Sequence, residues 1–266
     1  MLLSLGAHPI CDYSRRVILY CHGFASGPQS TKGVAFDRYF SERGHTVERL
    51  DLRVPSFEHL RLSKMIEVVQ DRLHDGDIVI GSSLGGLTAA RVAERDPRVK
   101  AVILLAPAFQ LVDRWREQLG SEWDAWRDRG YRVVPDFATG GMSKIDFGFV
   151  EDVQAIDVGY PDVRVPALVM HGTGDAVVPV DRSRTFARGR ARCISRGASG
   201  VDQSTVAPST GSSNAPHFPR FTRAFLAPPA GPFPRELDPV QGRQTAPEPC
   251  RQEGWLLTAD PSLRSG

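Results

Sequence analysis

A serine flanked by glycines lies where the sequence changes from an apolar run to a helical pattern. Ser83 is the central residue of Gly81-Ser82-Ser83-Leu84-Gly85, which is a GxSxG pattern. Glycines two residues before and after the serine allow a sharp strand-to-helix turn that lifts the hydroxyl above the sheet edge. The N-terminus of the following helix adds positive potential where an oxyanion would form. The pattern predicts a nucleophilic serine; the alternative is a plain glycine-rich turn whose serine only caps the helix.

Two backbone N–H groups would have to face that oxyanion. Leu84, the residue after the nucleophile, is expected to supply one of them. The second should come from the loop after an earlier apolar run, where Gly23 permits an unusual backbone conformation. Phe24 is the natural donor in this loop, with Ala25 as the alternative. His22 in the same loop is expected to be structural, bonding to backbone, rather than a catalytic base.

A carboxylate that could orient a catalytic base follows a later apolar run. Asp175 lies on a loop after the strand expected at 166–172. In this type of sheet the triad residues occur in the order Ser, Asp or Glu, then His, and catalytic groups gather at the carboxyl ends of strands. Asp175 is therefore the predicted triad acid, the alternative being a residue that caps a turn. Asp157 and Asp162 are weaker candidates because no buried strand precedes them.

The base is assigned by elimination. Six of the seven histidines precede Asp175, and His217 is the one that follows it. A triad needs a histidine that takes the Ser83 proton and returns it to the leaving group. The segment before His217 lacks a convincing final strand, with residues 190–197 as the only candidate. The alternative is a surface histidine in a disordered tail.

Strand and helix patterns alternate along the first two thirds of the chain. Short apolar runs predict buried strands, and apolar residues at helical spacing predict the helices between them. This alternation predicts an α/β protein with a mostly parallel sheet covered by helices on both faces. The expected strands are 17–21, 46–52, 77–83, 101–107 and 166–172, and the expected helices are near 34–40, 61–74 and 87–95.

An insertion of about residues 110–160 is too long for an ordinary connection between a strand and a helix. It contains Trp115, Trp123 and Trp126, which we expect in two short amphipathic helices. Its position after a strand end favours a lid whose aromatic side chains line a substrate pocket. A packed structural excursion is the alternative.

Composition excludes several classes of protein. The 33 basic and 31 acidic side chains give a net charge of +2, so we expect no nucleic-acid partner. No stretch approaches the roughly 18 apolar residues that a membrane span needs. The cysteines show no CxxC spacing and no nearby pair of histidines, so we expect no metal. The N-terminus lacks the basic region of a signal peptide, which favours a cytoplasmic protein. The four cysteines are Cys11, Cys21, Cys193 and Cys250.

Together these motifs resemble the α/β-hydrolase superfamily and, within it, the small bacterial esterases grouped as YqiA-like. The resemblance covers roughly residues 16–192. It implies that Ser83 is the nucleophile, that Asp175 is the triad acid, and that Phe24 and Leu84 donate to the oxyanion. It also implies a compact lid where the tryptophans fall. The motifs that carry it are YCHGFASGPQSTKG (20–33), GSSLGG (81–86), LLAPAF (104–109) and VMHGTGDAVVP (169–179).

The chain departs from this family after the acid. The family continues through a helix and a strand to a loop with Asp-Gly-His or similar, whereas this sequence has no histidine at that distance. One explanation is a divergent tail in which His217 swings in from a longer loop. The other is an altered reading frame or a sequence junction near Arg192.

Proline is distributed unevenly. Nine of the 20 prolines lie in residues 1–193 and 11 in the last 73. From about Ile194 we expect loop or disorder, although the helical spacing in 217–227 would let that segment dock on the domain. The expected parts are an N-terminal extension (1–15), an α/β-hydrolase domain (16–230) and an irregular proline-rich tail (231–266).

The function that the sequence predicts is serine-dependent hydrolysis of small to medium acyl esters through an acyl-enzyme, without a cofactor. Thioesterases, lipases and aminopeptidases share this machinery and differ in pocket shape. The alternative from another class is a hydrolase fold that has lost its base and acts as a binding module.

Overall fold

The structure is a computed structural model that describes residues 17–188, 190 and 193–198. Of residues 193–198 it describes the backbone path. His217, the segment 217–227 and the parts expected at 1–15 and 231–266 lie outside the described residues.

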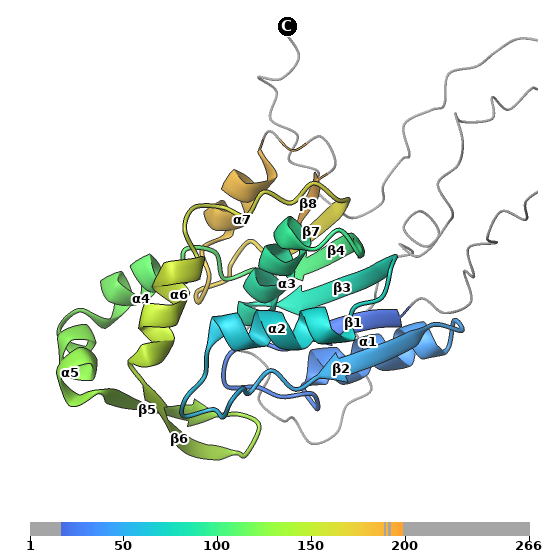
Figure 1. The fold of residues 1–266 in the computed structure, drawn as a ribbon. Coiled ribbons are helices and arrows are strands. Elements are labelled where there is room, and N and C mark those ends of the chain that lie inside the picture. The colour runs from blue at the N-terminus through green and yellow to red at the C-terminus, as the bar shows by residue number, and fades with distance from the viewer. Residues whose placement is uncertain (1–16, 189, 191–192, 199–266) are drawn as a thin grey trace, which may run out of the picture.

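A six-stranded parallel sheet forms the centre of the molecule (Figure 1), with the order β2-β1-β3-β4-β7-β8. Each neighbouring pair of strands is parallel. Such sheets need cover on both faces, and all six residues of β3 are buried. The strands are β1 (Val17–Cys21), β2 (Thr46–Leu50), β3 (Asp77–Ser82), β4 (Val99–Leu105), β7 (Ala167–Gly172) and β8 (Cys193–Ala198).

Two apolar clusters cover the two faces of this sheet. Alternate residues of β1 divide between them, because successive side chains of a strand point to opposite faces. Leu19 and Cys21 join the larger cluster with residues of α2 and α3, whereas Ile18 and Tyr20 join a smaller one with Phe36 of α1. The expected α/β fold is thus confirmed. The connecting helices are α1 (Thr31–Ser41), α2 (Leu62–Arg72), α3 (Leu84–Arg95) and α7 (Val180–Ala187).

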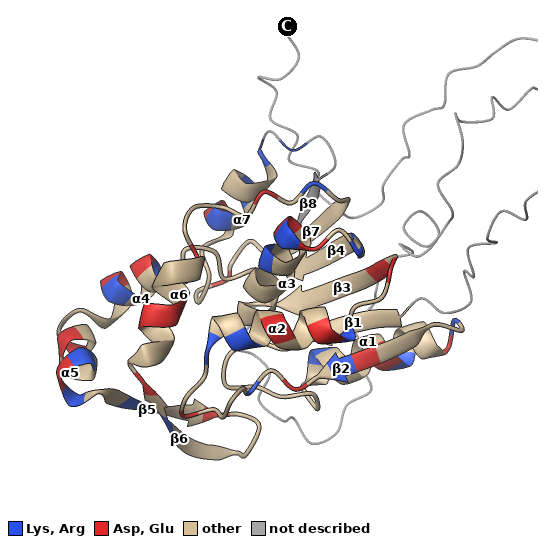
Figure 2. Ribbon diagram, viewed as in Figure 1, with Lys and Arg blue, Asp and Glu red and all other residues tan. Residues whose placement is uncertain are grey.

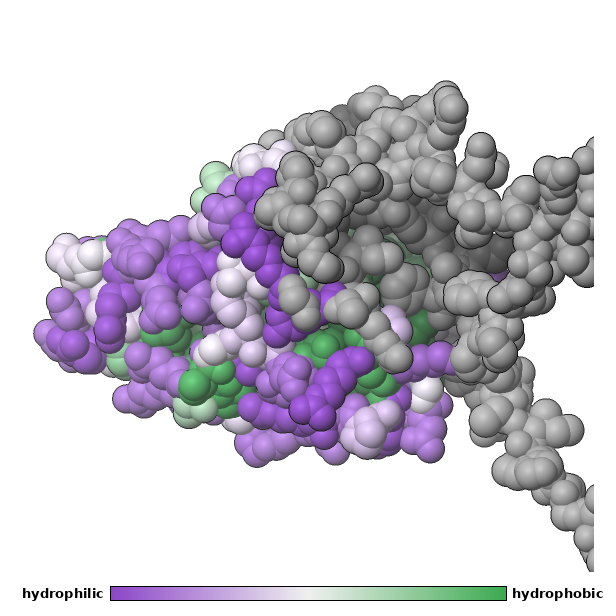
Figure 3. Space-filling model, turned by 90° about the horizontal axis from the view of Figure 1, so that it is seen from above, coloured by the Kyte–Doolittle hydropathy of each residue, from purple (hydrophilic) through white to green (hydrophobic). Residues whose placement is uncertain are grey.

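Charged residues avoid the middle of the sheet. Figure 2 shows them mainly on the helices, the loops, the β5–β6 hairpin and the edge strand β2. Strands β3 and β4 carry Asp77 and Lys100 near their starts, whereas β1 and β7 carry none. The described surface seen in Figure 3 is mainly hydrophilic with small hydrophobic areas. No helix among the described residues is both long and apolar enough to cross a bilayer.

The insertion between β4 and β7 packs beyond one end of the sheet (Figure 1). Its two expected short helices are present as α4 and α5. The sequence did not reveal the antiparallel hairpin of β5 and β6 or the helix α6 that complete it. The elements are α4 (Leu111–Leu119), α5 (Ser121–Arg129), β5 (Tyr131–Asp136), β6 (Gly141–Asp146) and α6 (Gly148–Ile156).

Strand β8 corrects the expectation that regular structure ends near Ile194. The strand pairs with β7 along its whole length, from Ala167 opposite Cys193 to Gly172 opposite Ala198. An edge strand gains its stability from backbone hydrogen bonds to one neighbour, so it does not require the apolar run that marks a central strand. The weak candidate at 190–197 therefore contains the start and middle of a strand, which the structure describes as Cys193–Ala198.

Candidate active site

The turn that carries Ser83 has the strained geometry expected of a nucleophile. Ser83 lies between β3 and α3 with φ 53° and ψ −116°, which is unfavourable for a residue with a side chain. Its N–H donates to the Leu105 carbonyl (2.9 Å), and its own carbonyl accepts from the Ala108 N–H (3.0 Å). The half-exposed side chain makes no capping hydrogen bond to α3. Ser83 therefore occupies the N-cap position of α3 without using its side chain to cap the helix.

The glycines around Ser83 are required by close backbone packing. A Cβ atom on Gly81 would lie 2.2 Å from the Gly85 carbonyl oxygen, and one on Gly85 would lie 2.2 Å from the Cys21 carbonyl oxygen. Neither distance is tolerable, and neither glycine has a positive φ. The GxSxG pattern thus lets the turn close tightly against β1.

The loop after β1 passes directly beside Ser83. A Cβ atom on Gly23 would lie 3.4 Å from the Ser83 Cβ. Ser26 N–H donates to the Gly23 carbonyl (3.3 Å), which closes a turn whose third residue, Ala25, has φ 56°. Within the described residues, the N–H groups of Phe24 and Leu84 donate no hydrogen bond. Neither predicted oxyanion donor is therefore hydrogen-bonded to an acceptor of the described residues. We call residues 23–27 the oxyanion loop below.

Aromatic side chains surround the Phe24 ring. Its centroid lies 5.1 Å from that of Trp115, 5.6 Å from that of Phe57 and 5.9 Å from that of Phe149. Trp115 on α4 is half-buried. The structure thus brings Trp115 to the loop beside Ser83.

The other two tryptophans of the predicted lid are buried inside the insertion, where the Trp126 ring packs on that of Trp115 with 5.9 Å between the centroids. Trp123 and Trp126 are only 4% and 2% exposed, and their rings pack on each other and on Phe147. Trp126 also donates its indole N–H to the Ile145 carbonyl (3.2 Å). These two side chains form the core of the insertion itself.

His22 is structural, as expected. Its Nε2 accepts from the Leu52 N–H (3.0 Å), which leaves Nδ1 as the donor to the Gly23 carbonyl (2.9 Å). Burial lowers the pKa of this imidazole, so it is neutral. Both nitrogens are engaged, and the ring fixes the start of the oxyanion loop.

Asp175 follows β7 and holds its carboxylate in an unusual environment. Oδ1 accepts from the N–H groups of Val177 (2.9 Å) and Val178 (2.8 Å). Oδ2 is buried and accepts no hydrogen bond from any described residue. A buried carboxylate oxygen without a donor is costly, so its retention favours a functional role.

Basic side chains lie around this carboxylate. Arg114 of α4 is buried and donates to the Val177 carbonyl. Burial lowers the pKa of Arg114 to about 10, and the negative charge of Asp175 opposes this effect. Asp175 also opposes the lowering that burial imposes on the pKa of Lys32. The insertion therefore contacts the acid loop through Arg114.

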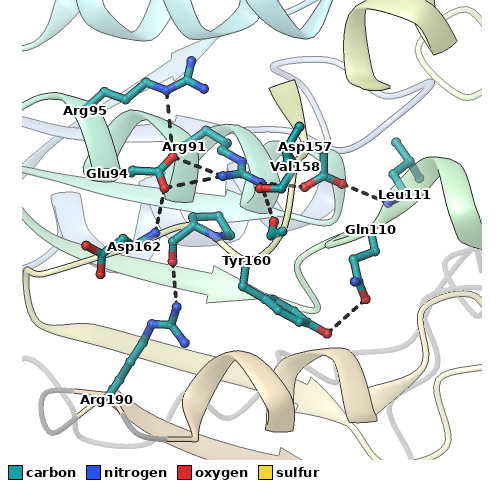
Figure 4. A network of polar contacts seen from close by, with 12 residues as sticks. Arg91, Glu94, Arg95, Gln110, Leu111, Asp157, Val158, Tyr160, Asp162 and Arg190 are labelled. Atoms are coloured by element: carbon teal, nitrogen blue, oxygen red, sulfur yellow. Dashed lines mark hydrogen bonds and ion pairs between the residues drawn. The ribbon is translucent and has the colours of Figure 1, made fainter. Parts of the chain in front are cut away.

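The weaker acid candidates are engaged elsewhere. Asp157 accepts from Arg91 (3.1 Å) and from the Leu111 N–H (3.0 Å), and burial raises its pKa. Figure 4 shows Arg91 at the centre of this network, which ties α3 to the end of the insertion. Asp162 is exposed and pairs with Arg164 (2.8 Å). Neither carboxylate offers a buried oxygen that lacks a donor.

The described residues contain no group of three or more His, Cys, Asp or Glu side chains that could hold a metal ion. The third predicted triad member, His217, falls outside them, so its position relative to Ser83 and Asp175 stays a prediction.

A family comparison classifies the chain. The model described as "Uncharacterised protein family (UPF0227)" matches residues 17–198, which is more than half of the chain. The protein belongs to the UPF0227 family. The resemblance to YqiA-like α/β hydrolases is confirmed by this match together with the fold. A search of curated protein sequences found no match.

Solved structures share the fold of this UPF0227 chain at low sequence identity. A putative hydrolase from Agrobacterium vitis S4 has a TM-score of 0.63 at 21% identity, over 74% of this chain and 84% of that one. Alpha/beta hydrolase domain-containing protein 10 from mouse has a TM-score of 0.60 at 22% identity, over 71% and 82%. Est1E from Butyrivibrio proteoclasticus with bound ferulic acid has a TM-score of 0.59 at 23% identity, over 71% and 82%. These comparisons establish the α/β-hydrolase fold.

Proposed function

We propose that this protein is a serine hydrolase that cleaves carboxylic esters through an acyl-enzyme. The observation that carries the proposal is the position of Ser83. Ser83 lies on a strained turn, and its hydroxyl makes no capping hydrogen bond to α3. The turn lies beside a loop in which the Phe24 N–H donates no hydrogen bond to the described residues. Oδ2 of Asp175, which is buried and accepts from no described residue, adds a second component, because it can accept the ring N–H of a catalytic histidine.

The reaction follows from these roles. Ser83 Oγ attacks the ester carbonyl while the base, proposed to be His217, takes its proton. The Phe24 and Leu84 N–H groups stabilise the resulting oxyanion. Collapse of the tetrahedral intermediate expels the alcohol, which receives the proton from the imidazolium, and leaves the acyl group on Ser83. Water activated by the same base then hydrolyses the acyl-enzyme.

The substrate class follows from the side chains nearest the oxyanion loop. Phe24 and Trp115 present apolar rings, which favours small to medium apolar acyl groups. We further propose that α4, which carries Trp115 and Arg114, belongs to a lid over the substrate.

Hydrolysis of p-nitrophenyl esters with acyl chains from acetyl to decanoyl tests this function. The wild-type protein should hydrolyse at least one ester with saturation kinetics, and Ser83→Ala should reduce the rate to background. His217→Ala should reduce kcat by about 10³-fold or more if His217 is the base. His74→Gln, which changes an exposed histidine, is the matched control. Equal rates for the wild-type protein and Ser83→Ala would contradict the proposal.

A further inference from the structure

We propose that the Arg53–Asp136 ion pair positions the oxyanion loop, so that the hairpin of the insertion belongs to the machinery that stabilises the transition state. This inference rests on the proposed function. Asp136 ends strand β5, and Arg53 follows strand β2, so the pair joins segments 83 residues apart.

The pair is bidentate and its carboxylate is buried. Arg53 Nη1 and Nη2 each donate to one oxygen of Asp136 at 2.8 Å. Asp136 is 1% exposed and also accepts from Ser143 Oγ (2.8 Å). The hydrogen bonds from Arg53 hold the pKa of Asp136 well below its usual range. A bidentate guanidinium–carboxylate contact fixes both partners in orientation as well as in distance.

Arg53 and the two residues after Asp136 contact the oxyanion loop. The residue after Asp136, Phe137, donates its N–H to the Ala25 carbonyl (2.8 Å), and Ala138 lies against Gly27. Arg53 donates weakly to the Ser26 carbonyl (3.5 Å).

A second connection between the ion pair and the oxyanion loop runs through aromatic rings. The Arg53 guanidinium lies 4.5 Å from the centroid of the Phe57 ring. Phe57 packs in turn on Phe24, with 5.6 Å between the ring centroids. The ion pair therefore supports the oxyanion loop in two ways, through the backbone of the loop and through the Phe24 side chain.

The loop needs such support because of Ala25. This buried alanine has φ 56°, a conformation that residues with a Cβ rarely adopt and that persists when the surroundings over-determine it. The Phe137 hydrogen bond fixes the Ala25 carbonyl, and Ala25 follows the proposed donor Phe24. A shift of Phe24 would weaken binding of the transition state more than binding of the substrate.

The same hairpin offers a matched control. Arg61 donates to both oxygens of Asp146 at 2.7 and 3.0 Å, at the opposite end of the two strands. Among the described contacts this pair holds the 58–61 segment through Leu60, Glu58 and His59. Asp146 also accepts from the N–H of Phe149 (3.2 Å), whose ring packs on that of Phe24. Among the described residues, however, neither Arg61 nor Asp146 hydrogen-bonds to residues 23–27. The two pairs have similar geometry and differ in their contact with the oxyanion loop.

The test measures kcat, KM, unfolding by urea and the inhibition constant of a trifluoromethyl ketone, which mimics the tetrahedral oxyanion. In the full-length protein, Asp136→Asn should lower kcat about tenfold or more and weaken inhibition by a similar factor, with KM changed less than about twofold. Arg53→Lys keeps the positive charge but loses the two parallel hydrogen bonds of the guanidinium. Its kcat and its inhibition constant should lie between those of the wild-type protein and Asp136→Asn. This variant replaces Asp136→Asn in the test if Asp136→Asn does not fold. Asp146→Asn and Arg61→Lys should lower stability and leave kcat and inhibition unchanged.

Two results would overturn the inference in distinguishable ways. Equal effects of the two ion pairs on kcat and inhibition, in a protein that is active, would show that Arg53 and Asp136 are merely structural. A wild-type protein that neither hydrolyses esters nor binds the ketone would remove the proposed function, and the inference with it.

Discussion

His171 Nε2 lies 3.6 Å from Asp175 Oδ2, yet its proton is donated to the carbonyl oxygen of Val178 at 2.9 Å. The other ring nitrogen lies 2.7 Å from Ser183 Oγ. His171 is therefore fully occupied in holding the loop after β7. Among the described residues, Asp175 Oδ2 accepts no hydrogen bond, which leaves it available to another donor.

Asp175→Asn should leave the loop folded and remove most of the activity. The amide oxygen can keep the two backbone hydrogen bonds, but it no longer stabilises an imidazolium. We expect kcat to fall by about 10³- to 10⁴-fold with little change in KM. Asp162→Asn, at an exposed carboxylate, should retain full activity. A loss of less than tenfold in Asp175→Asn would argue against its role as the triad acid.

Acidification should destabilise the protein through its buried histidines. Burial lowers the pKa of both His22 and His171, so the unfolded chain binds their protons at a higher pH than the folded one. Their contribution to the free energy of unfolding is fully present above about pH 6.5 and is lost as the pH falls toward the folded pKa values. Urea unfolding at pH 7.5 and pH 5.5 measures this loss.

The matched variants for this pH effect are His171→Gln and His74→Gln. His171→Gln should show a smaller difference between the two pH values than the wild-type protein. His74→Gln, at an exposed position, should reproduce the wild-type difference. An identical pH dependence in all three proteins would show that the buried imidazole of His171 does not contribute.

Trp115 and Trp123 should separate substrate selection from folding. Trp115→Ala opens space beside the Phe24 ring and should shift the preferred p-nitrophenyl ester toward longer acyl chains. Trp123→Ala leaves a cavity inside the insertion and should lower the free energy of unfolding by about 3–5 kcal/mol while the chain-length preference stays as in wild type. The same shift in both variants would contradict the placement of Trp115 at the acyl group.

Gly85→Ala should disrupt the turn that carries Ser83. The added methyl group would meet the Cys21 carbonyl oxygen at 2.2 Å, which forces β1 and α3 apart. We expect the free energy of unfolding to fall by about 3 kcal/mol or more. Gly174→Ala should be nearly neutral, because among the described residues no atom beyond its two chain neighbours lies within 4 Å of the added methyl group. Comparable stability of the two variants in urea would contradict the tight packing of the turn.

The parts that were predictable have strong local signals. Buried parallel strands require apolar runs, and the turn at Ser83 requires glycines at fixed spacing, so both are visible in the sequence. Strand β8 is different, because an edge strand depends on backbone pairing with β7. The β5–β6 hairpin exposes the apolar side chains of Val133 and Met142 and buries the carboxylate of Asp136, so its sequence lacks the alternation of apolar and polar residues that marks a half-buried strand.

Contacts between distant segments could not be predicted. The sequence around Arg53 and around Asp136 carries no motif that marks either residue, and the two come together only when the insertion folds. The three tryptophans could not be told apart from the sequence either, because all of them lie on short helices of the insertion. Among the three, the structure places the Trp115 ring on that of Phe24. Residue type indicated the chemistry of the site, whereas packing determined which residues contribute to it.

Labelling with a fluorophosphonate probe tests the central claim most directly, because the probe reacts only with a serine that is activated in a folded site. At neutral pH the wild-type protein should gain one adduct, mapped by mass spectrometry to the peptide that contains Ser83. Ser83→Ala and urea-unfolded wild-type protein should gain none. A folded wild-type protein whose Ser83 stays unmodified would contradict the assignment of Ser83 as the nucleophile.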